Sequence, residues 1–158
     1  NYISLWDTER GTEMHVFDKQ GTGITSVGWM DWTAGNFLST NALTGVIKVW
    51  NASQKAPIET YRVTQGGIKS SHVRSGSPRV LCAAMDGSFK VFNMNHRSEE
   101  YSTEPGHTET IFDCCFSKTN PDRFASCSFD GTVKVWNLVD NKIIISCQKV
   151  DTAIYKID

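Results

Sequence analysis

A short strand-like segment that occurs four times constrains this chain more than any other feature. Each copy alternates apolar or β-branched residues with others and ends on a large aromatic side chain followed by Asp or Asn. The four aromatic residues are 44, 42 and 44 residues apart, and they are Trp6, Trp50, Phe92 and Trp136. A period of this length predicts a repeat protein, in which units that cannot bury their apolar faces alone stack on their neighbours.

The stretch 106–137 contains the most complete copy of the repeating unit. It opens with Gly106-His107 and reaches an Asp130-Gly131 turn six residues before Trp136. With these dipeptides in place around a tryptophan-anchored period, the chain resembles the WD-repeat β-propellers over its whole length. The resemblance implies four-stranded blades that surround a central channel and pack face to face on one another.

The predicted fold class is therefore all-β, a WD-repeat β-propeller that is incomplete. A propeller needs about four to eight blades of about 40 to 45 residues, and a chain of 158 residues holds too few. We expect part of one domain, with three full four-stranded blades and a partial blade at each end. The expected bounds are 1–18 for a half blade, 19–62, 63–105 and 106–150 for the full blades, and 151–158 for the first strand of a further blade.

The second and third repeats depart from the fourth at its polar positions. The places of His107, Ser126 and Asp130 are expected to be taken by Gln20, Thr40 and Thr44 in the second repeat and by Thr64, Cys82 and Asp86 in the third. The third repeat also has Phe92 in place of a tryptophan. Because Phe has no indole N–H that needs an acceptor, these two blades should depend more on apolar packing than the fourth.

Three residues of the fourth repeat, His107, Ser126 and Asp130, have the chemistry of a hydrolase triad. The family resemblance implies another role, a buried hydrogen-bond network in which the Trp136 indole donates to Ser126, Ser126 donates to His107, and His107 donates to Asp130. A serine hydroxyl engaged by an indole inside a blade has no substrate approach and no oxyanion hole. We therefore expect no catalytic residue and no enzyme activity.

Metal and cofactor sites are not indicated. The chain has no Cys-x-x-Cys and no pair of histidines at ligand spacing. Gly21-Thr22-Gly23 and Gly66-Gly67 precede predicted strands, so they lack the helix N-terminus that holds a phosphate. Adjacent Cys114 and Cys115 should point to opposite faces of a strand and cannot chelate together. We expect no cofactor.

Charge and cysteine content bound the partners and the compartment. With 17 acidic and 16 basic residues the formal net charge is −1, so neither nucleic acid nor an anionic membrane is the expected partner. No apolar stretch approaches the roughly 18 residues that would span a bilayer. The five cysteines are an odd number and fall in predicted strands, which favours reduced thiols and an intracellular, cytoplasmic location.

The predicted functional surface is the edge of the propeller where innermost strands begin and second strands end. Candidate protein-binding residues there are Thr25, Leu43, Lys69, Met85, Thr110, Phe112 and Phe129. They favour a rigid scaffold for protein partners within a larger protein or multiprotein complex. The rest of the propeller, or an adjoining chain, could pack on the open ends. Two alternatives stay open, a non-catalytic substrate-recruiting module of a larger enzyme and, less favoured by the balanced charge, an RNA-binding propeller.

Overall fold

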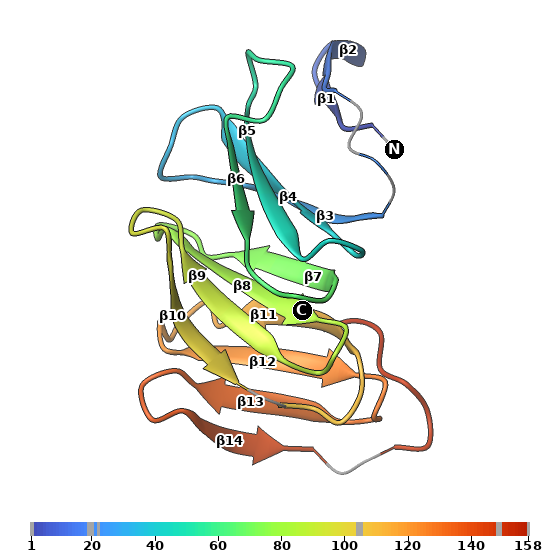
Figure 1. Ribbon diagram of the computed structural model, residues 1–158, viewed down its shortest axis with the longest axis vertical. Coiled ribbons are helices and arrows are strands. Elements are labelled where there is room, and N and C mark those ends of the chain that lie inside the picture. The colour runs from blue at the N-terminus through green and yellow to red at the C-terminus, as the bar shows by residue number, and fades with distance from the viewer. Residues whose placement is uncertain (1, 19–20, 22, 104–105, 148–149, 158) are drawn as a thin grey trace.

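Antiparallel strands make up the regular secondary structure of this chain. The structure is a computed structural model that describes residues 2–18, 21, 23–103, 106–147 and 150–157. Within these ranges it contains fourteen strands and no helix. The strands form one two-stranded and three four-stranded sheets, which follow one another along the long axis of the molecule (Figure 1). The prediction of an all-β fold, consistent with an incomplete WD β-propeller, is confirmed.

Each four-stranded sheet is a meander in which consecutive strands are neighbours. The first sheet contains β1 (Ser4–Asp7) and β2 (Thr12–Val16). The second blade contains β3 (Ile24–Trp29), β4 (Asn36–Asn41), β5 (Val46–Asn51) and β6 (Glu59–Arg62). The third contains β7 (Ile68–Val73), β8 (Arg79–Ala84), β9 (Phe89–Asn93) and β10 (Ser98–Thr103). The fourth contains β11 (Ile111–Phe116), β12 (Arg123–Ser128), β13 (Val133–Asn137) and β14 (Lys142–Ser146).

The repeated aromatic residues occupy the same place in each blade. Trp50, Phe92 and Trp136 lie in the third strands β5, β9 and β13 and pair with apolar residues of the second strands, which are Phe37, Val80 and Phe124. The period of the sequence is therefore the period of the blades. Trp6 lies in β1 of the two-stranded sheet and pairs with Glu13.

The apolar core lies between the blades. One cluster joins the second and third blades through residues such as Leu38, Ile47 and Val80. Another joins the third and fourth blades, where the Phe89 ring meets Phe124 at 4.5 Å and Trp136 at 4.6 Å between ring centroids. Face-to-face stacking is what a four-stranded sheet with two apolar faces requires, since a single blade leaves both of its faces in water.

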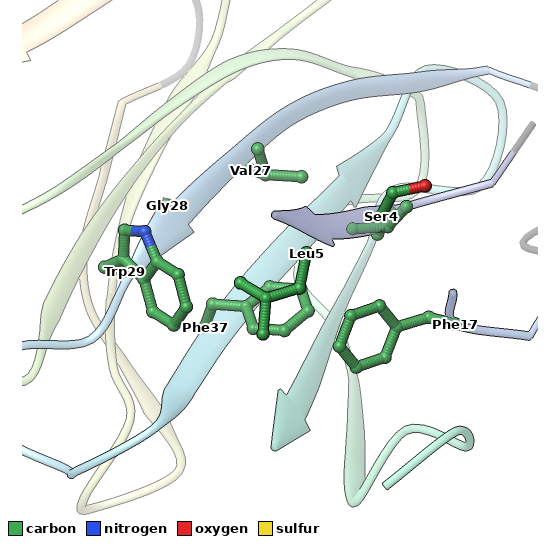
Figure 2. Close-up of a pocket in the computed structure, with 8 residues that line it drawn as sticks. Ser4, Leu5, Phe17, Val27, Gly28, Trp29 and Phe37 are labelled. Carbon is green, nitrogen blue, oxygen red and sulfur yellow. The ribbon is translucent and has the colours of Figure 1, made fainter. Parts of the chain in front are cut away.

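The first sheet covers only part of the second blade. Phe17, which follows β2, packs its ring on Phe37 and Trp50 at 4.9 and 5.8 Å between centroids. Beside this contact a cavity of about 140 Å³ opens between β1 and β3, and Figure 2 shows the side chains around it. Val27 and Trp29 of β3 line the cavity and are more than half exposed. This face of the second blade is therefore incompletely covered.

Residues 150–157 differ from the expectation of an innermost strand, because they form no strand. Val150 N–H donates to Gly131 O at 3.0 Å and Ile154 N–H donates to Ser128 O at 3.3 Å, but a strand needs a continuous ladder of such bonds with a neighbour. The segment does follow the path of the earlier repeats, since His107 N–H donates in the same way to Gly87 O, at 3.0 Å. The expected blade bounds stay a prediction.

Candidate functional site

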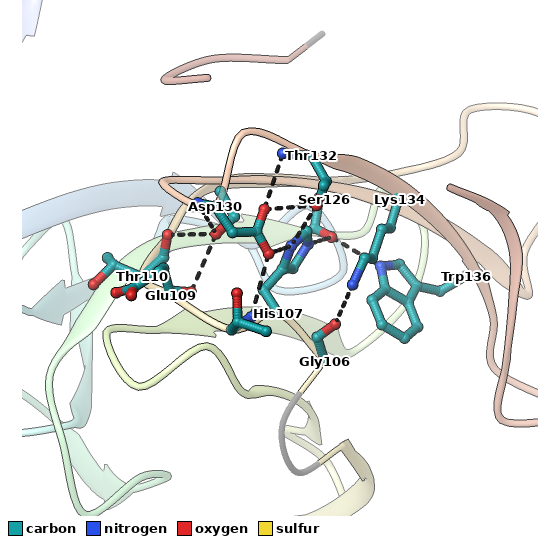
Figure 3. Close-up of polar contacts among 11 residues, drawn as sticks. Gly106, His107, Glu109, Thr110, Ser126, Asp130, Thr132, Lys134 and Trp136 are labelled. Carbon is teal, nitrogen blue, oxygen red and sulfur yellow. Dashed lines mark hydrogen bonds and ion pairs between the residues drawn. The ribbon is translucent and has the colours of Figure 1, made fainter. Parts of the chain in front are cut away.

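The four polar residues singled out in the fourth repeat are in contact in the structure. Trp136 Nε1 donates to Ser126 Oγ at 2.8 Å, and Ser126 Oγ lies 2.7 Å from His107 Nε2. The other imidazole nitrogen, Nδ1, lies 2.9 Å from Asp130 Oδ2. All four side chains are buried. Figure 3 shows the resulting chain of hydrogen bonds, which runs from β13 through β12 to the loop before β11 and the turn after β12.

Electrostatics fixes the direction of these hydrogen bonds. Burial lowers the pKa of His107, and the opposing effect of Asp130 does not restore it to its ordinary value. Burial raises the pKa of Asp130, but hydrogen bonds from Thr132 and His107 outweigh burial and bring the pKa to about 2. At neutral pH a neutral imidazole therefore donates from Nδ1 to a carboxylate and accepts at Nε2 from the serine hydroxyl.

The arrangement of these four side chains is better suited to a structural role than to catalysis. Ser126 is fully buried, and its oxygen accepts from the Trp136 indole while its proton is directed at His107. A nucleophile needs an open approach and donors placed around the oxyanion that forms. In this site the Ser126 hydroxyl is instead fully hydrogen-bonded to Trp136 and His107.

The same network links the fourth blade to the third. Gly106 and His107 both donate their backbone N–H to Gly87 O, at 3.1 and 3.0 Å, and Lys134 Nζ donates to Gly106 O at 2.8 Å. Gly87 has φ of +84°, and a Cβ there would lie 2.4 Å from His107 O. Only glycine fits this turn without a shift of the backbone. His107 is thus held by hydrogen bonds to its backbone N–H as well as to its imidazole ring.

The second blade contains a shorter version of the network, at a position one residue away from the expected one. The prediction that Thr40 takes the place of Ser126 is wrong, because Trp50 Nε1 donates to Ser39 Oγ at 3.0 Å. Thr40 instead bonds the hydroxyls of Thr25 and Ser26 at 3.0 and 2.8 Å. Six residues, 41–46, lie between the last paired residues Thr40 and Ile47, whereas five, 128–132, lie between Cys127 and Val133, so counting back across the turn misplaces the serine by one.

Cys82 lies in the third blade at the expected serine position, paired with Lys90 as Ser126 is paired with Lys134. Full burial raises the pKa of its thiol to about 12, so it packs there as a small apolar group. Burial also raises the pKa of Cys114 well above its ordinary value. None of the five cysteines is in a disulfide.

The predicted protein-binding residues lie at one edge of the blades, which we call the upper face. It is defined by the starts of β3, β7 and β11 and by the turns 42–45, 85–88 and 129–132. Leu43, Met85 and Phe129 each lie two residues before the glycine of their turn and are 67%, 45% and 55% exposed. They therefore form an apolar row that repeats with the blades.

Several of these predicted residues are brought together. Lys69 Nζ lies 5.4 Å from the Phe112 ring centroid, and the Phe112 and Phe129 centroids are 6.0 Å apart. Thr110 Oγ1 donates to Met85 O at 2.8 Å. Two of the predicted residues, Thr25 and Leu43, make contacts with other residues of the blades instead. Thr25 donates its hydroxyl to Ile68 O at 2.7 Å, and Leu43 lies against Gly23.

Tyr155 is a member of this surface that sequence reasoning missed. Its ring centroid lies 4.7 Å from that of Phe112. The available signal was the spacing, since Lys69, Phe112 and Tyr155 follow one another at intervals of 43 residues. This is the period of the blades, and Lys69 and Phe112 are the second residues of the innermost strands β7 and β11.

The described residues contain neither a cluster suited to a metal ion nor a membrane-spanning helix. No group of three or more His, Cys, Asp or Glu side chains in these ranges is placed to hold a metal ion. None of the described segments forms a helix of the length and apolarity needed to cross a membrane.

Comparison with known proteins places this geometry among WD-repeat proteins. A family model described as WD domain, G-beta repeat, matches residues 98–137. SIR4-interacting protein SIF2 of Saccharomyces cerevisiae is 23% identical over 91% of this chain and 29% of its own length. U3 snoRNP-associated protein-like EMB2271 of Arabidopsis thaliana is 23% identical over 89% of this chain and 28% of its own. WD repeat, SAM and U-box domain-containing protein 1 of Gallus gallus is 32% identical over 44% and 14%.

The fold and these matches support a protein-interaction propeller domain, and the WD-repeat propeller family is generally non-catalytic. The resemblance to WD-repeat β-propellers is confirmed, and the matched repeat is the one that carries the His107 network. The chain spans less than a third of the length of these relatives. Within the repeat, 107–114 and 128–136 resemble WD repeat-containing protein 17 in particular, and that finer likeness stays a prediction.

Proposed function

We propose that this chain is a rigid scaffold for protein partners within a larger protein or multiprotein complex, and that partners bind its upper face. The observation that carries the proposal is the row of exposed apolar side chains Leu43, Met85 and Phe129 at equivalent turns of three successive blades. Large apolar side chains in a contiguous surface with polar surroundings are characteristic of protein-binding sites.

Backbone hydrogen bonds beneath this row support a rigid arrangement of the blades. At each junction a glycine carbonyl in the turn of one blade accepts a backbone N–H from the next repeat. Gly45 O accepts from Val63 at 2.9 Å, Gly87 O from His107 at 3.0 Å, and Gly131 O from Val150 at 3.0 Å. The exposed side chains are therefore held at fixed separations before a partner arrives, which reduces the conformational entropy lost on binding.

Partners that are not proteins have less support. The formal net charge of −1 offers no basic footprint for nucleic acid or for an anionic membrane, so we propose neither. The mostly buried cysteines, none of them in a disulfide, support an intracellular, cytoplasmic location. At the open face of the second blade, exposed Val27 and Trp29 support packing of further propeller strands or of an adjoining chain.

A second candidate function is a non-catalytic module that recruits substrates for a larger enzyme. It uses the same upper face, and the support is that one relative combines WD repeats with other domains, as the name WD repeat, SAM and U-box domain-containing protein 1 states. An RNA-binding propeller has weaker support, because the relative named after a snoRNP is offset by the balanced charge of this chain.

Site-specific photo-crosslinking tests the proposal. A photoreactive phenylalanine analogue replaces Phe129 on the upper face, and the matched control replaces Val139, an exposed apolar residue in the turn between β13 and β14 at the opposite edge. In cells we expect discrete protein adducts from position 129 and few from position 139. Equal labelling at the two positions, or labelling at 139 alone, would refute the upper face as the binding surface.

A further inference from the structure

Three aromatic side chains meet on the upper face where β11 begins. Phe112 is the second residue of β11, Phe129 belongs to the turn after β12, and Tyr155 comes from the segment 150–157. The Phe112 ring centroid lies 6.0 Å from that of Phe129 and 4.7 Å from that of Tyr155. Phe129 and Tyr155 are 55% and 65% exposed. Together they offer a partly open apolar surface on which a large side chain of a partner could lie.

Two lysines flank these rings. Lys69 Nζ lies 5.4 Å from the Phe112 centroid, a cation–π contact that holds the ammonium at the surface. Among the described residues no carboxylate lies within ion-pair distance of it. Lys156 has an 83% exposed side chain and lies 3.4 Å from Asp113 Oδ2. Lys69, which has no carboxylate partner among the described residues, favours an anionic group on the partner at this place.

The Asp113 carboxylate does not cancel this preference, because it is buried and already engaged. It accepts from Ser70 Oγ at 2.8 Å and from the Ile157 N–H at 3.2 Å. Its charge is directed into the junction between innermost strands, while the lysine ammonium lies outside it. The Lys156 side chain is 83% exposed and Asp113 is buried, so the lysine ammonium, and not this carboxylate, is accessible to a partner.

Next to the rings lies a groove of about 390 Å³ along the innermost strands. Hydroxyl groups line much of it, among them those of Thr25, Ser26, Ser70 and Ser71. A hydroxyl has more than one hydrogen-bonding capacity, so groups that bond one another, as Ser26 and Ser71 do at 2.6 Å, can still bond a partner's backbone. The volume is in the range of pockets that accept a small ligand or a few side chains.

We propose that this part of the upper face binds an extended acidic peptide segment of a partner protein, with a large apolar side chain on the aromatic rings and a carboxylate between Lys69 and Lys156. The inference rests on the proposed function, because it names the partner chemistry of the same surface. A basic segment is disfavoured, since Lys69 already occupies the face of the Phe112 ring.

Selection from a random peptide library displayed on phage tests the proposal, with the immobilised protein as bait. We expect the enriched peptides to combine Asp or Glu with Leu, Phe or Trp within a few residues. In Lys69→Gln or Lys156→Gln the affinity of a synthesised enriched peptide should fall about twofold to fivefold, the range of an exposed ion pair. The control Lys142→Gln, on exposed β14, should leave it unchanged.

Aromatic contacts are tested with the same peptide. Phe129→Ala should weaken binding by roughly tenfold, as removal of an aromatic anchor does, while Val139→Ala should have no effect. If the enriched peptides need Phe129 but carry no acidic preference and ignore both lysine variants, the acidic-peptide inference is overturned and the upper-face platform stands. Enrichment of basic peptides, or no enrichment, also overturns the inference, whereas the crosslinking at 129 and 139 decides the platform separately.

Discussion

Replacement of Ser126 by alanine is the sharpest test of the buried network. The serine oxygen lies 2.8 Å from the Trp136 indole nitrogen and 2.7 Å from His107 Nε2, and the residue is fully buried. Without the hydroxyl both neighbours lose a partner in a place that water does not reach. Each stranded buried group costs about 1 to 3 kcal/mol, and the alanine no longer buries a hydroxyl. We therefore expect the free energy of unfolding to fall by about 2 to 4 kcal/mol.

Ser39→Ala in the second blade is the matched control. Ser39 accepts from the Trp50 indole at 3.0 Å, and no histidine of the described chain is bonded to it. Only one group is stranded, so the loss should be about 1 to 2 kcal/mol. Urea titration followed by tryptophan fluorescence gives both values, and an unchanged m-value shows that the comparison is of native-state stability.

Two results would contradict the argument. If Ser126→Ala costs no more than Ser39→Ala, then the imidazole contributes nothing through the serine. If losses from Ser126→Ala and His107→Ala add fully in the double variant, the two side chains are not one network, because members of a network are non-additive. A phosphonylating probe that labels Ser126 in the folded protein would overturn the non-catalytic interpretation itself.

Three further predictions concern protonation, backbone and thiols. The folded pKa values of Asp130 and His107 are both lowered, so stability should fall as pH drops below about 6.5, where the unfolded histidine takes up a proton. It should fall by about 2 kcal/mol more between about pH 4 and pH 2, where the unfolded Asp130 carboxylate is protonated first. Denaturant titrations should show that Asp130→Asn removes this acid step. Gly87→Ala, where a Cβ would meet His107 O, should lower the unfolding free energy by about 2 kcal/mol or more. The control Gly76→Ala, where a Cβ meets nothing within 4 Å, should cost only about 1 kcal/mol for its positive φ. Thermal unfolding distinguishes the two variants. Under native conditions an alkylating reagent should modify exposed Cys147 first and leave Cys82 unmodified until unfolding, as mapped by mass spectrometry, since burial raises the pKa of Cys82 to about 12; early labelling of Cys82 would show that the core opens.

The repeat made the blades predictable, because an aromatic residue that recurs every 42 to 44 residues indicates that the same strand occurs in each repeating unit. Positions near a turn were less predictable. Ser39 was missed because one extra residue between the last paired residues of β4 and β5 changes the count but not the strand pairing. Register in a sheet is set by hydrogen bonds and burial across the strands, which a count along the sequence does not contain.

The end of the chain shows the other limit. Residues 150–157 have the alternation of a strand, but a strand also needs a neighbour for its ladder, and these residues form none. Tyr155 nevertheless reaches Phe112, a contact that follows from the period and could have been predicted from it. Side-chain placement on the upper face was therefore more predictable than the secondary structure that carries it.

The turn carbonyls of Gly45, Gly87 and Gly131 each accept from the repeat that follows. Every blade is thus coupled to its immediate neighbours, and the molecule behaves as a linear array with nearest-neighbour terms. Damage to one junction should loosen the two blades that share it and leave a distant blade almost as it was. Hydrogen exchange in such an array should be slowest where an intact junction adjoins a filled network, around β12 and β13, and should speed up toward the first sheet.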